Sequence, residues 1–121
     1  MFRDLLVVEL ASVLAGPAVG MFFAEQGARV IKIENRKNGG DVTRSWRLSS
    51  EDRSKQTSAY FCSVNYNKEY VGADLKSESD YKKVIDLISR ADIVISNFDS
   101  DYTSIYDLME ASYDFEPSVR V

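Results

Sequence analysis

Two features of the composition restrict the side chains that are available for catalysis. The 121 residues include no histidine and a single cysteine, Cys62. Ser-His-Asp and Cys-His catalysis are therefore excluded, and so are an internal disulfide and a zinc site built from cysteines. Cys62 lies in the apolar and aromatic run AYFCSV, which favours a buried, unreactive thiol over a nucleophile. Any chemistry must use carboxylates, lysines, backbone groups or a bound cofactor.

The segment VLAGPAVG, residues 13–20, places a Gly-Pro pair between an apolar run and a helical pattern. The unpaired N–H groups and the dipole at the start of a helix can bind a phosphate. Glu34, at the end of the next apolar run, stands where a dinucleotide-binding protein places its ribose-binding acid. However, the turn offers only Gly16 and Gly20 in place of G-x-G-x-x-G, and Pro17 removes one N–H donor. A conventional NAD or FAD site is therefore disfavoured.

The charge of the chain is unevenly distributed. The formal net charge is −4, yet residues 29–76 contain ten of the fifteen lysines and arginines against six acidic residues. A nucleic-acid-binding protein is usually basic overall, so nucleic acid is not an expected partner and the basic middle suits a compact anionic ligand better. A solvated loop rich in lysine and arginine explains the charge equally well.

Hydrophobic patterns predict the elements that position these residues. Residues 5–11 form an apolar run broken only by Glu9, which is typical of a strand buried on both faces. Pro17 suits the first turn of a following helix, and Gly27 suits the left-handed position that ends it. Residues 29–34 alternate apolar and charged side chains and predict a second strand. The resulting β-α-β unit favours a right-handed crossover between parallel strands.

The second half of the chain repeats this alternation. Residues 69–75 have strand character, Ser77 and Asp80 form a capping box that predicts a helix start, and residues 92–96 indicate a short buried strand. This order predicts an α/β, Rossmann-like fold with a mostly parallel sheet and flanking helices, in a single domain of residues 1–121. After these elements, an acidic helix is expected around residues 102–111.

A polar stretch separates the two halves. Residues 35–57 predict a long loop, and a loop of this length in a compact domain is usually functional or mobile. Trp46 is its one aromatic side chain and is expected to pin the loop onto the body. The loop contains the pair Gly39 and Gly40, and its basic residues could close over phosphates: Arg36, Lys37, Arg44 and Arg47.

The sequence shows neither a membrane-spanning run nor a signal peptide. No apolar stretch approaches the length that crosses a bilayer, and the N-terminus lacks the ordered basic, apolar and small-residue regions of a secretory leader. The expectation is a cytoplasmic protein without a membrane partner.

Several of these segments, in this order, resemble the N-terminal part of the class III CoA-transferases. This family includes formyl-CoA transferase, carnitine CoA-transferase and the α-methylacyl-CoA racemases. The resemblance runs from about Leu5 to Phe98 and is carried by VVELASVLAGPAVGMFFAEQGARVIKIENRKNGGDVTRSW, YFCSVNYNKEYVGADLKSESD and ADIVISNF. It implies a domain that binds coenzyme A or an acyl-CoA and needs no metal.

The resemblance also implies which residues contact CoA, because in this family the turn after the first strand lies against the ligand. Lys76 is the strongest candidate for a phosphate partner, since its ammonium is a mobile point charge. The alternatives are that Lys76 is an ordinary solvated lysine, that Leu14 belongs to the core and that Asn97 caps the turn after its own strand. By position, the implied contacts are Val13, Leu14, Ala15, Asn35, Ala73, Asp74, Leu75, Lys76, Asn97, Phe98 and Asp99.

The chain departs from the family pattern in ways that lower the expected affinity. Lys68 is followed by Glu69 where relatives commonly have a basic pair, and NFDSD stands in place of NFRPG. The family's catalytic aspartate, which forms an anhydride with the acyl group, lies beyond the matched region. No catalytic residue is therefore assigned, and the isolated chain is expected to be inactive.

The resemblance predicts the CoA-binding domain of a class III acyl-CoA:carboxylate CoA-transferase, truncated before the catalytic aspartate. Two alternatives stay open: a non-catalytic module that binds CoA or a nucleotide, and an interaction protein that kept the fold and lost the ligand. Relatives form interlocked dimers, so apolar surfaces buried in relatives would be exposed here. A homo-oligomer is therefore expected.

Overall fold

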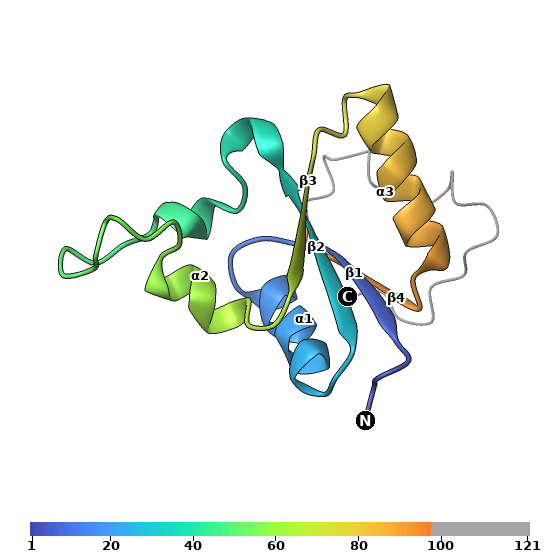
Figure 1. The fold of residues 1–121 in the computed structure, drawn as a ribbon, viewed down its shortest axis with the longest axis horizontal. Coiled ribbons are helices and arrows are strands. Elements are labelled where there is room, and N and C mark those ends of the chain that lie inside the picture. The colour runs from blue at the N-terminus through green and yellow to red at the C-terminus, as the bar shows by residue number, and fades with distance from the viewer. Residues whose placement is uncertain (98–121) are drawn as a thin grey trace.

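A four-stranded parallel sheet forms the centre of the protein. The computed structural model describes residues 1–97, so Phe98, Asp99 and the helix expected at residues 102–111 lie outside the described residues. The sheet consists of β1 (Leu6–Leu10), β2 (Arg29–Asn35), β3 (Glu69–Ala73) and β4 (Ile93–Ser96) in the order β3-β2-β1-β4. All three strand pairs are parallel, which confirms the predicted α/β fold (Figure 1).

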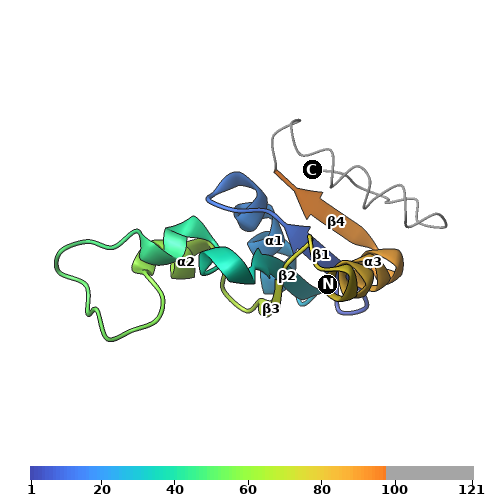
Figure 2. The ribbon, with the colours of Figure 1, turned by 90° about the horizontal axis from the view of Figure 1, so that it is seen from above.

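Helices cover both faces of this sheet. Helix α1 (Ala15–Glu25) packs on one face and α3 (Glu78–Arg90) on the other. Between β2 and β3 the chain forms two 3₁₀ helices, η1 (Arg36–Asn38) and η2 (Val42–Ser45), and the short helix α2 (Ala59–Val64). The segment between η2 and α2 projects away from the sheet in both views (Figures 1 and 2).

Alternating side chains of the strands supply two separate apolar clusters. Val8 and Ile31 face α3, where they meet Val84 and Ile88, whereas Val7 and its neighbours on the opposite face pack against α1. β1 and β4 are nearly continuous apolar runs, as expected for a parallel sheet with helices on both faces, whereas β3 at one edge of the sheet is mostly exposed. Val84 and Ile88, the buried residues of α3, lie four positions apart, so one face of this helix is apolar.

The predicted ends of α1 are confirmed, but the predicted capping box of α3 is wrong. Pro17 lies in the first turn of α1, and Gly27 follows its end with a φ of 96°. Ser77 is the N-cap of α3 but makes no side-chain capping bond. The carboxylate of Asp80 instead accepts hydrogen bonds from the backbone N–H of Asp74 at 2.8 Å and from Arg36 at 2.9 Å.

Cys62 is exposed, which contradicts the expected buried thiol. The run that contains it folds as α2, because Ser58 caps the helix and accepts a hydrogen bond from the N–H of Phe61. Phe61 and Val64 are the buried residues of this helix, three positions apart, and Cys62 lies outside the face that they define. The helical period therefore places the thiol in solvent.

The glycines of the segment VLAGPAVG allow α1 to approach the sheet. A Cβ atom at Gly16 would overlap with the side chain of Ala11, and one at Gly20 would overlap with the carboxylate of Glu9. At Gly20 that atom would also come within 3.2 Å of the ammonium nitrogen of Lys68. These two positions are therefore small because the helix packs closely on β1 and the residues that follow it.

Gly20→Ala is expected to destabilise the protein by about 3 kcal/mol, because the new methyl group displaces a buried carboxylate from its ammonium partners. Urea unfolding followed by far-UV circular dichroism measures the change. Gly72→Ala is the matched control, since a Cβ there meets only the Arg36 side chain, at 3.3 Å. A gain in stability at Gly20, the ordinary result of replacing glycine in a helix, would contradict this account of the packing.

Candidate functional site

The carboxyl ends of the four parallel strands meet at one edge of the sheet. The strand order reverses between β1 and β4, and ligands of open α/β sheets bind at such a switch point. Of the sequence-predicted contact residues, Val13–Ala15 follow β1, Asn35 ends β2, Ala73 ends β3 and Asn97 follows β4. The structure therefore brings these positions to one edge, and contact with a ligand stays a prediction.

The turn after β1 has an unusual backbone conformation. Val13 has a φ of 69°, in the left-handed region that a β-branched residue rarely adopts. Strain of this kind is on the order of 1–3 kcal/mol and persists only where surrounding contacts hold it. Leu14 and Ala15 are exposed, so the alternative that Leu14 belongs to the core is wrong.

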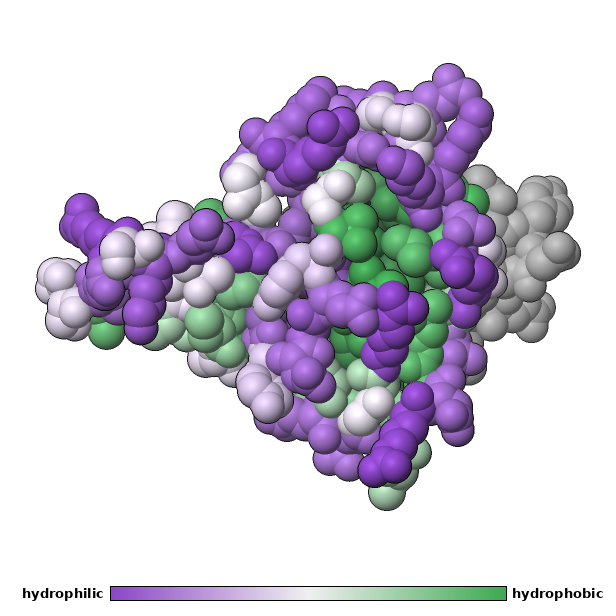
Figure 3. Space-filling view, in the orientation of Figure 1, coloured by the Kyte–Doolittle hydropathy of each residue, from purple (hydrophilic) through white to green (hydrophobic). Residues whose placement is uncertain are grey.

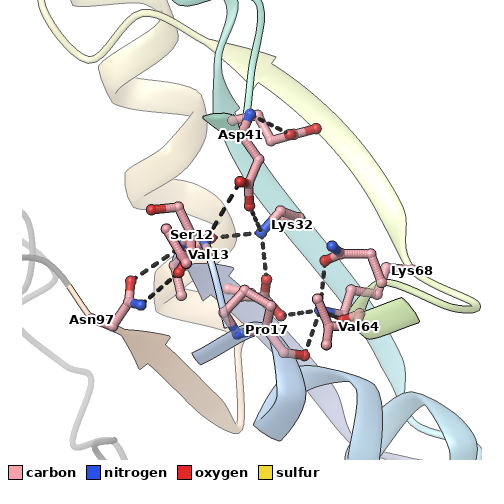
Figure 4. A network of polar contacts seen from close by, with 12 residues as sticks. Ser12, Val13, Pro17, Lys32, Asp41, Val64, Lys68 and Asn97 are labelled. Carbon is pink, nitrogen blue, oxygen red and sulfur yellow. Dashed lines mark hydrogen bonds and ion pairs between the residues drawn. The ribbon is translucent and has the colours of Figure 1, made fainter. Parts of the chain in front are cut away.

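Asn97 connects β4 to this turn. Its side-chain oxygen accepts a hydrogen bond from the N–H of Ser12 at 2.9 Å, and its side-chain nitrogen donates to the carbonyl of Ser12 at 2.7 Å (Figure 4). The amide therefore pairs with the backbone after β1 across the switch point. The alternative that Asn97 only caps the turn after its own strand is therefore incomplete.

A cluster of four buried charged residues lies on the α1 side of the same edge. Glu9 bridges two lysines: its Oε1 atom is 2.8 Å from the ammonium of Lys32, and its Oε2 atom is 2.7 Å from that of Lys68. Asp41 lies 3.1 Å from Lys32, on the other side. All four side chains are at most 1% exposed, so each charge depends on the others for compensation.

This charge cluster holds the backbone of several elements. Lys32 donates to the carbonyl of Ala11 at 2.6 Å, and Lys68 donates to the carbonyls of Pro17 in α1 and Val64 in α2 (Figure 4). Sequence reasoning did not assign these residues to the site. The one available signal was Glu9, an acid inside an otherwise apolar strand.

Asp41 joins the cluster to the turn after β1. Its Oδ1 atom accepts hydrogen bonds from the N–H and hydroxyl of Thr43, at 3.0 and 2.8 Å, and lies 3.5 Å from the N–H of Val13. Burial raises the pKa of Asp41, but the hydrogen bonds from Thr43 and the charge of Lys32 outweigh burial, so the pKa is below its usual value. Asp41 is therefore a carboxylate at neutral pH.

A second polar group lies where β2 and β3 end. The ammonium of Lys37 is 2.7 Å from the carboxylate of Asp74, and this hydrogen bond lowers the pKa of Asp74. Asn35 accepts a hydrogen bond from the N–H of Lys37, and Asp74 accepts one from the N–H of Lys76. Leu75 packs against the α3 cluster. Lys76 is exposed, and its ammonium has no ion-pair partner within residues 1–97.

The loop between β2 and β3 is tied down by internal contacts. Arg44 binds both carboxylate oxygens of Glu34, at 2.9 and 2.6 Å, and lies 3.9 Å from the ring centre of Phe61. Glu34 is therefore occupied and does not stand free for a ribose. Trp46 packs against Tyr60 of α2 with ring centres 5.2 Å apart and is 45% exposed, so it ties the loop to α2 and not to the sheet, whereas a contact with the body of the domain was expected.

The basic side chains of this loop do not support the predicted closure over phosphates. Arg36 pairs with Asp80, Lys37 with Asp74 and Arg44 with Glu34. Arg47 donates to the carbonyls of Asp52 and Lys55. Each of the four would have to break an existing interaction before it could reach a ligand.

The departure at Glu69 has a structural explanation. Glu69 begins β3, at the end opposite to the carboxyl edge of the sheet, and pairs with Arg29 through two hydrogen bonds of 2.9 and 3.0 Å. It therefore removes no positive charge from the carboxyl edge, contrary to the expectation from sequence. Lys68, just before it, belongs to the buried charge cluster.

Within residues 1–97, no group of three potential metal-binding His, Cys, Asp or Glu side chains comes together. The same part of the chain contains no helix that is long and apolar enough to cross a bilayer.

The Lys68 ammonium predicts a pH-dependent stability. Burial lowers its pKa from 10.5 to about 8, and attraction to Glu9 only partly opposes this. Between these values the unfolded chain binds a proton that the folded chain has released, so the free energy of unfolding rises with pH. Relative to Lys68→Met, we expect the wild type to gain stability between about pH 8 and 10, measured by urea unfolding. A difference in the free energy of unfolding between the two proteins that stays constant with pH would show that the pKa of the Lys68 amine is not lowered.

Comparison with known proteins identifies the family. The model of CoA-transferase family III matches residues 2–113. The succinate–glutarate CoA-transferase of Agrobacterium fabrum is 43% identical over 105 residues, which cover 84% of this chain and 26% of that protein. The cinnamoyl-CoA:phenyllactate CoA-transferase of Clostridium sporogenes is 39% identical over 100 residues, 81% of this chain and 24% of that protein. The chain thus spans about a quarter of the length of these curated relatives.

A solved structure agrees with this assignment. A CAIB/BAIF family protein from Brucella suis superposes with a TM-score of 0.78 at 35% sequence identity, over 91% of this chain and 30% of that one. The fold, the family match and the similar sequences agree, and the chain belongs to CoA-transferase family III.

Proposed function

We propose that this chain is the coenzyme A-binding part of a class III acyl-CoA:carboxylate CoA-transferase, with CoA or an acyl-CoA as its ligand. The observation that carries the proposal is the switch point, where the left-handed turn at Val13 lies beside Asn97 in a member of this family. We assign transfer of CoA to the whole protein. The chain itself spans about a quarter of the length of its curated relatives.

The start of α1 supports an anionic ligand at this edge. Leu14 is the N-cap and provides no side-chain hydrogen bond, and Pro17 has no N–H group. Ala18 donates its N–H to the carbonyl of Leu14, so the N–H groups of Ala15 and Gly16 are left for a partner outside the helix, and the positive end of the helix dipole favours a negative one. Leu14 and Ala15 are exposed, so a ligand has access to them.

Lys76 supplies a second point of attachment in this proposal. It follows β3 at the same edge, and Asp74 beside it is already paired with Lys37. The charge of Lys76 is therefore available for a phosphate of CoA.

Cys62 is exposed and is a free thiol, not part of a disulfide. A free thiol suits a reducing compartment such as the cytoplasm.

The 121-residue chain is expected to bind CoA more tightly than ATP or NAD and to transfer no CoA to a carboxylate. Isothermal titration measures the affinities, and thermal unfolding reports stabilisation by the bound ligand. Lys76→Ala should weaken CoA binding by about tenfold, because a charge-assisted contact to phosphate is lost. Arg90→Ala removes the same charge from the far end of α3 and should leave the affinity unchanged.

The three possible results of this titration lead to different conclusions. Saturable binding without transfer supports the proposal. Transfer by the isolated chain would contradict the assignment of catalysis to the whole protein. A folded chain that shows no saturable response to millimolar CoA would instead identify an interaction protein that lost its ligand.

We also propose that the chain self-associates through exposed apolar surface. Figure 3 shows an apolar area on the face of the sheet beside α3, rimmed by hydrophilic residues. Leu6 and Val71 are partly buried residues of the cluster on that face. Further large apolar side chains are exposed elsewhere: Leu14, Phe22, Val42, Trp46 and Leu48. Exposed apolar surface of this kind favours association.

Light scattering at increasing protein concentration tests the association. We expect an average mass above that of a monomer at high concentration, with a decrease on dilution as the copies separate. A monomer mass across the whole concentration range would contradict the proposal.

A further inference from the structure

We propose that two clamps hold the turn at Val13 in its strained form, and that this fixed turn is what the protein presents to CoA. The first clamp is the side chain of Asn97, and the second is the pair Lys32 and Asp41 of the buried charge cluster. The inference rests on the proposed function and assigns these three residues as positioning residues for the turn.

The strain at Val13 is not explained by its own residue type. Within residues 1–97, Val13 and Asn67 are the two non-glycine residues with positive φ, at 69° and 58°. Asparagine tolerates this conformation through local hydrogen bonding, whereas the branched Cβ of valine does not. Contacts from outside the turn must therefore hold Val13 where it is.

The first clamp acts on the residue before Val13. Both polar groups of the Asn97 amide bind the backbone of Ser12, at 2.9 and 2.7 Å. Two hydrogen bonds to one residue fix both the position and the orientation of its peptide groups. Because Asn97 follows β4, this clamp depends on the pairing of β4 with β1.

The second clamp acts from the opposite side of the chain. Lys32 donates to the carbonyl of Ala11 at 2.6 Å, and Asp41 lies 3.5 Å from the N–H of Val13 (Figure 4). Both side chains are at most 1% exposed, and Thr43 holds the Asp41 carboxylate in place. The three residues Ala11, Ser12 and Val13 are therefore fixed by contacts from two sides.

A fixed turn has an advantage for binding. The ordering of a flexible turn opposes association, whereas a turn that is ordered during folding imposes no such penalty when the ligand arrives. The exposed residues Leu14 and Ala15 follow the strained residue directly, as the N-cap and the first residue of α1. The contacts that fix residues 11–13 therefore also fix where the exposed start of α1 lies.

The clamp itself is tested without a ligand, in the 121-residue chain. Val13→Gly relieves the strain and should raise the ratio of folded to unfolded chain by roughly fivefold to thirtyfold in urea unfolding. In an Asn97→Ala background the turn can relax already, so the same substitution should gain much less. An equal gain in stability in both backgrounds, or no gain at all, would overturn the proposal that Asn97 clamps the turn.

Affinity for CoA tests what the fixed turn does. By isothermal titration, Val13→Gly should bind CoA about two- to fivefold more weakly than the wild type although it is more stable, because glycine has more freedom to lose. Val13→Ala keeps a Cβ and should stay near the wild-type affinity. Asn67→Gly, at the other left-handed residue, should leave the affinity unchanged.

The outcomes separate this inference from the proposed function. A wild type that binds CoA, with Val13→Gly binding equally well, overturns the inference and leaves the proposed function standing. Equal losses in Val13→Gly and Val13→Ala would assign the effect to the valine side chain and also overturn the inference. A wild type that does not bind CoA overturns the proposed function, together with the ligand-facing part of the inference.

Discussion

The burial of two lysines beside two carboxylates is the constraint on which the rest of this structure depends. An ammonium or carboxylate without a partner in such a place is strongly destabilising, so Glu9, Lys32, Asp41 and Lys68 must be assembled together. Their remaining hydrogen bonds to the backbone reach four segments: the turn after β1, α1, α2 and η2. One set of electrostatic contacts therefore ties α1, α2 and η2 to the sheet.

This constraint explains the sequence at the junction between β1 and α1. The small residues there resemble a phosphate-binding turn, yet Gly16 and Gly20 have a packing role, because Cβ atoms at these positions would overlap with Ala11 and Glu9. At the carboxyl edge of the sheet, the cluster and Asn97 instead make hydrogen bonds to the backbone of residues 11–13. The same short segment therefore has a buried side that packs on the sheet and an exposed side, at Leu14 and Ala15, where we propose that the ligand binds.

Much of the fold was predictable because it is encoded in local patterns. The apolar runs, Pro17 and Gly27 predicted the β-α-β unit, and the order of the segments led to the family. The charge cluster was not predictable, because it depends on the register that sets Glu9 opposite Lys32. Similarly, the sequence gives no sign that Val13 is left-handed, since contacts from distant residues impose that conformation. Cys62 was misjudged because the run around it folds as a helix.

The hydrogen bonds between Ser12 and Asn97 join residues that are 85 positions apart. A chain grows from its N-terminus during synthesis, so the β-α-β unit and β3 emerge before β4. A nascent chain that ends before β4 already contains the turn and the lysine after β3, but lacks the strand that completes the edge. The hydrogen bonds that Asn97 makes to the turn can thus form only late in the emergence of this domain from the ribosome, when the last strand takes its place beside the first.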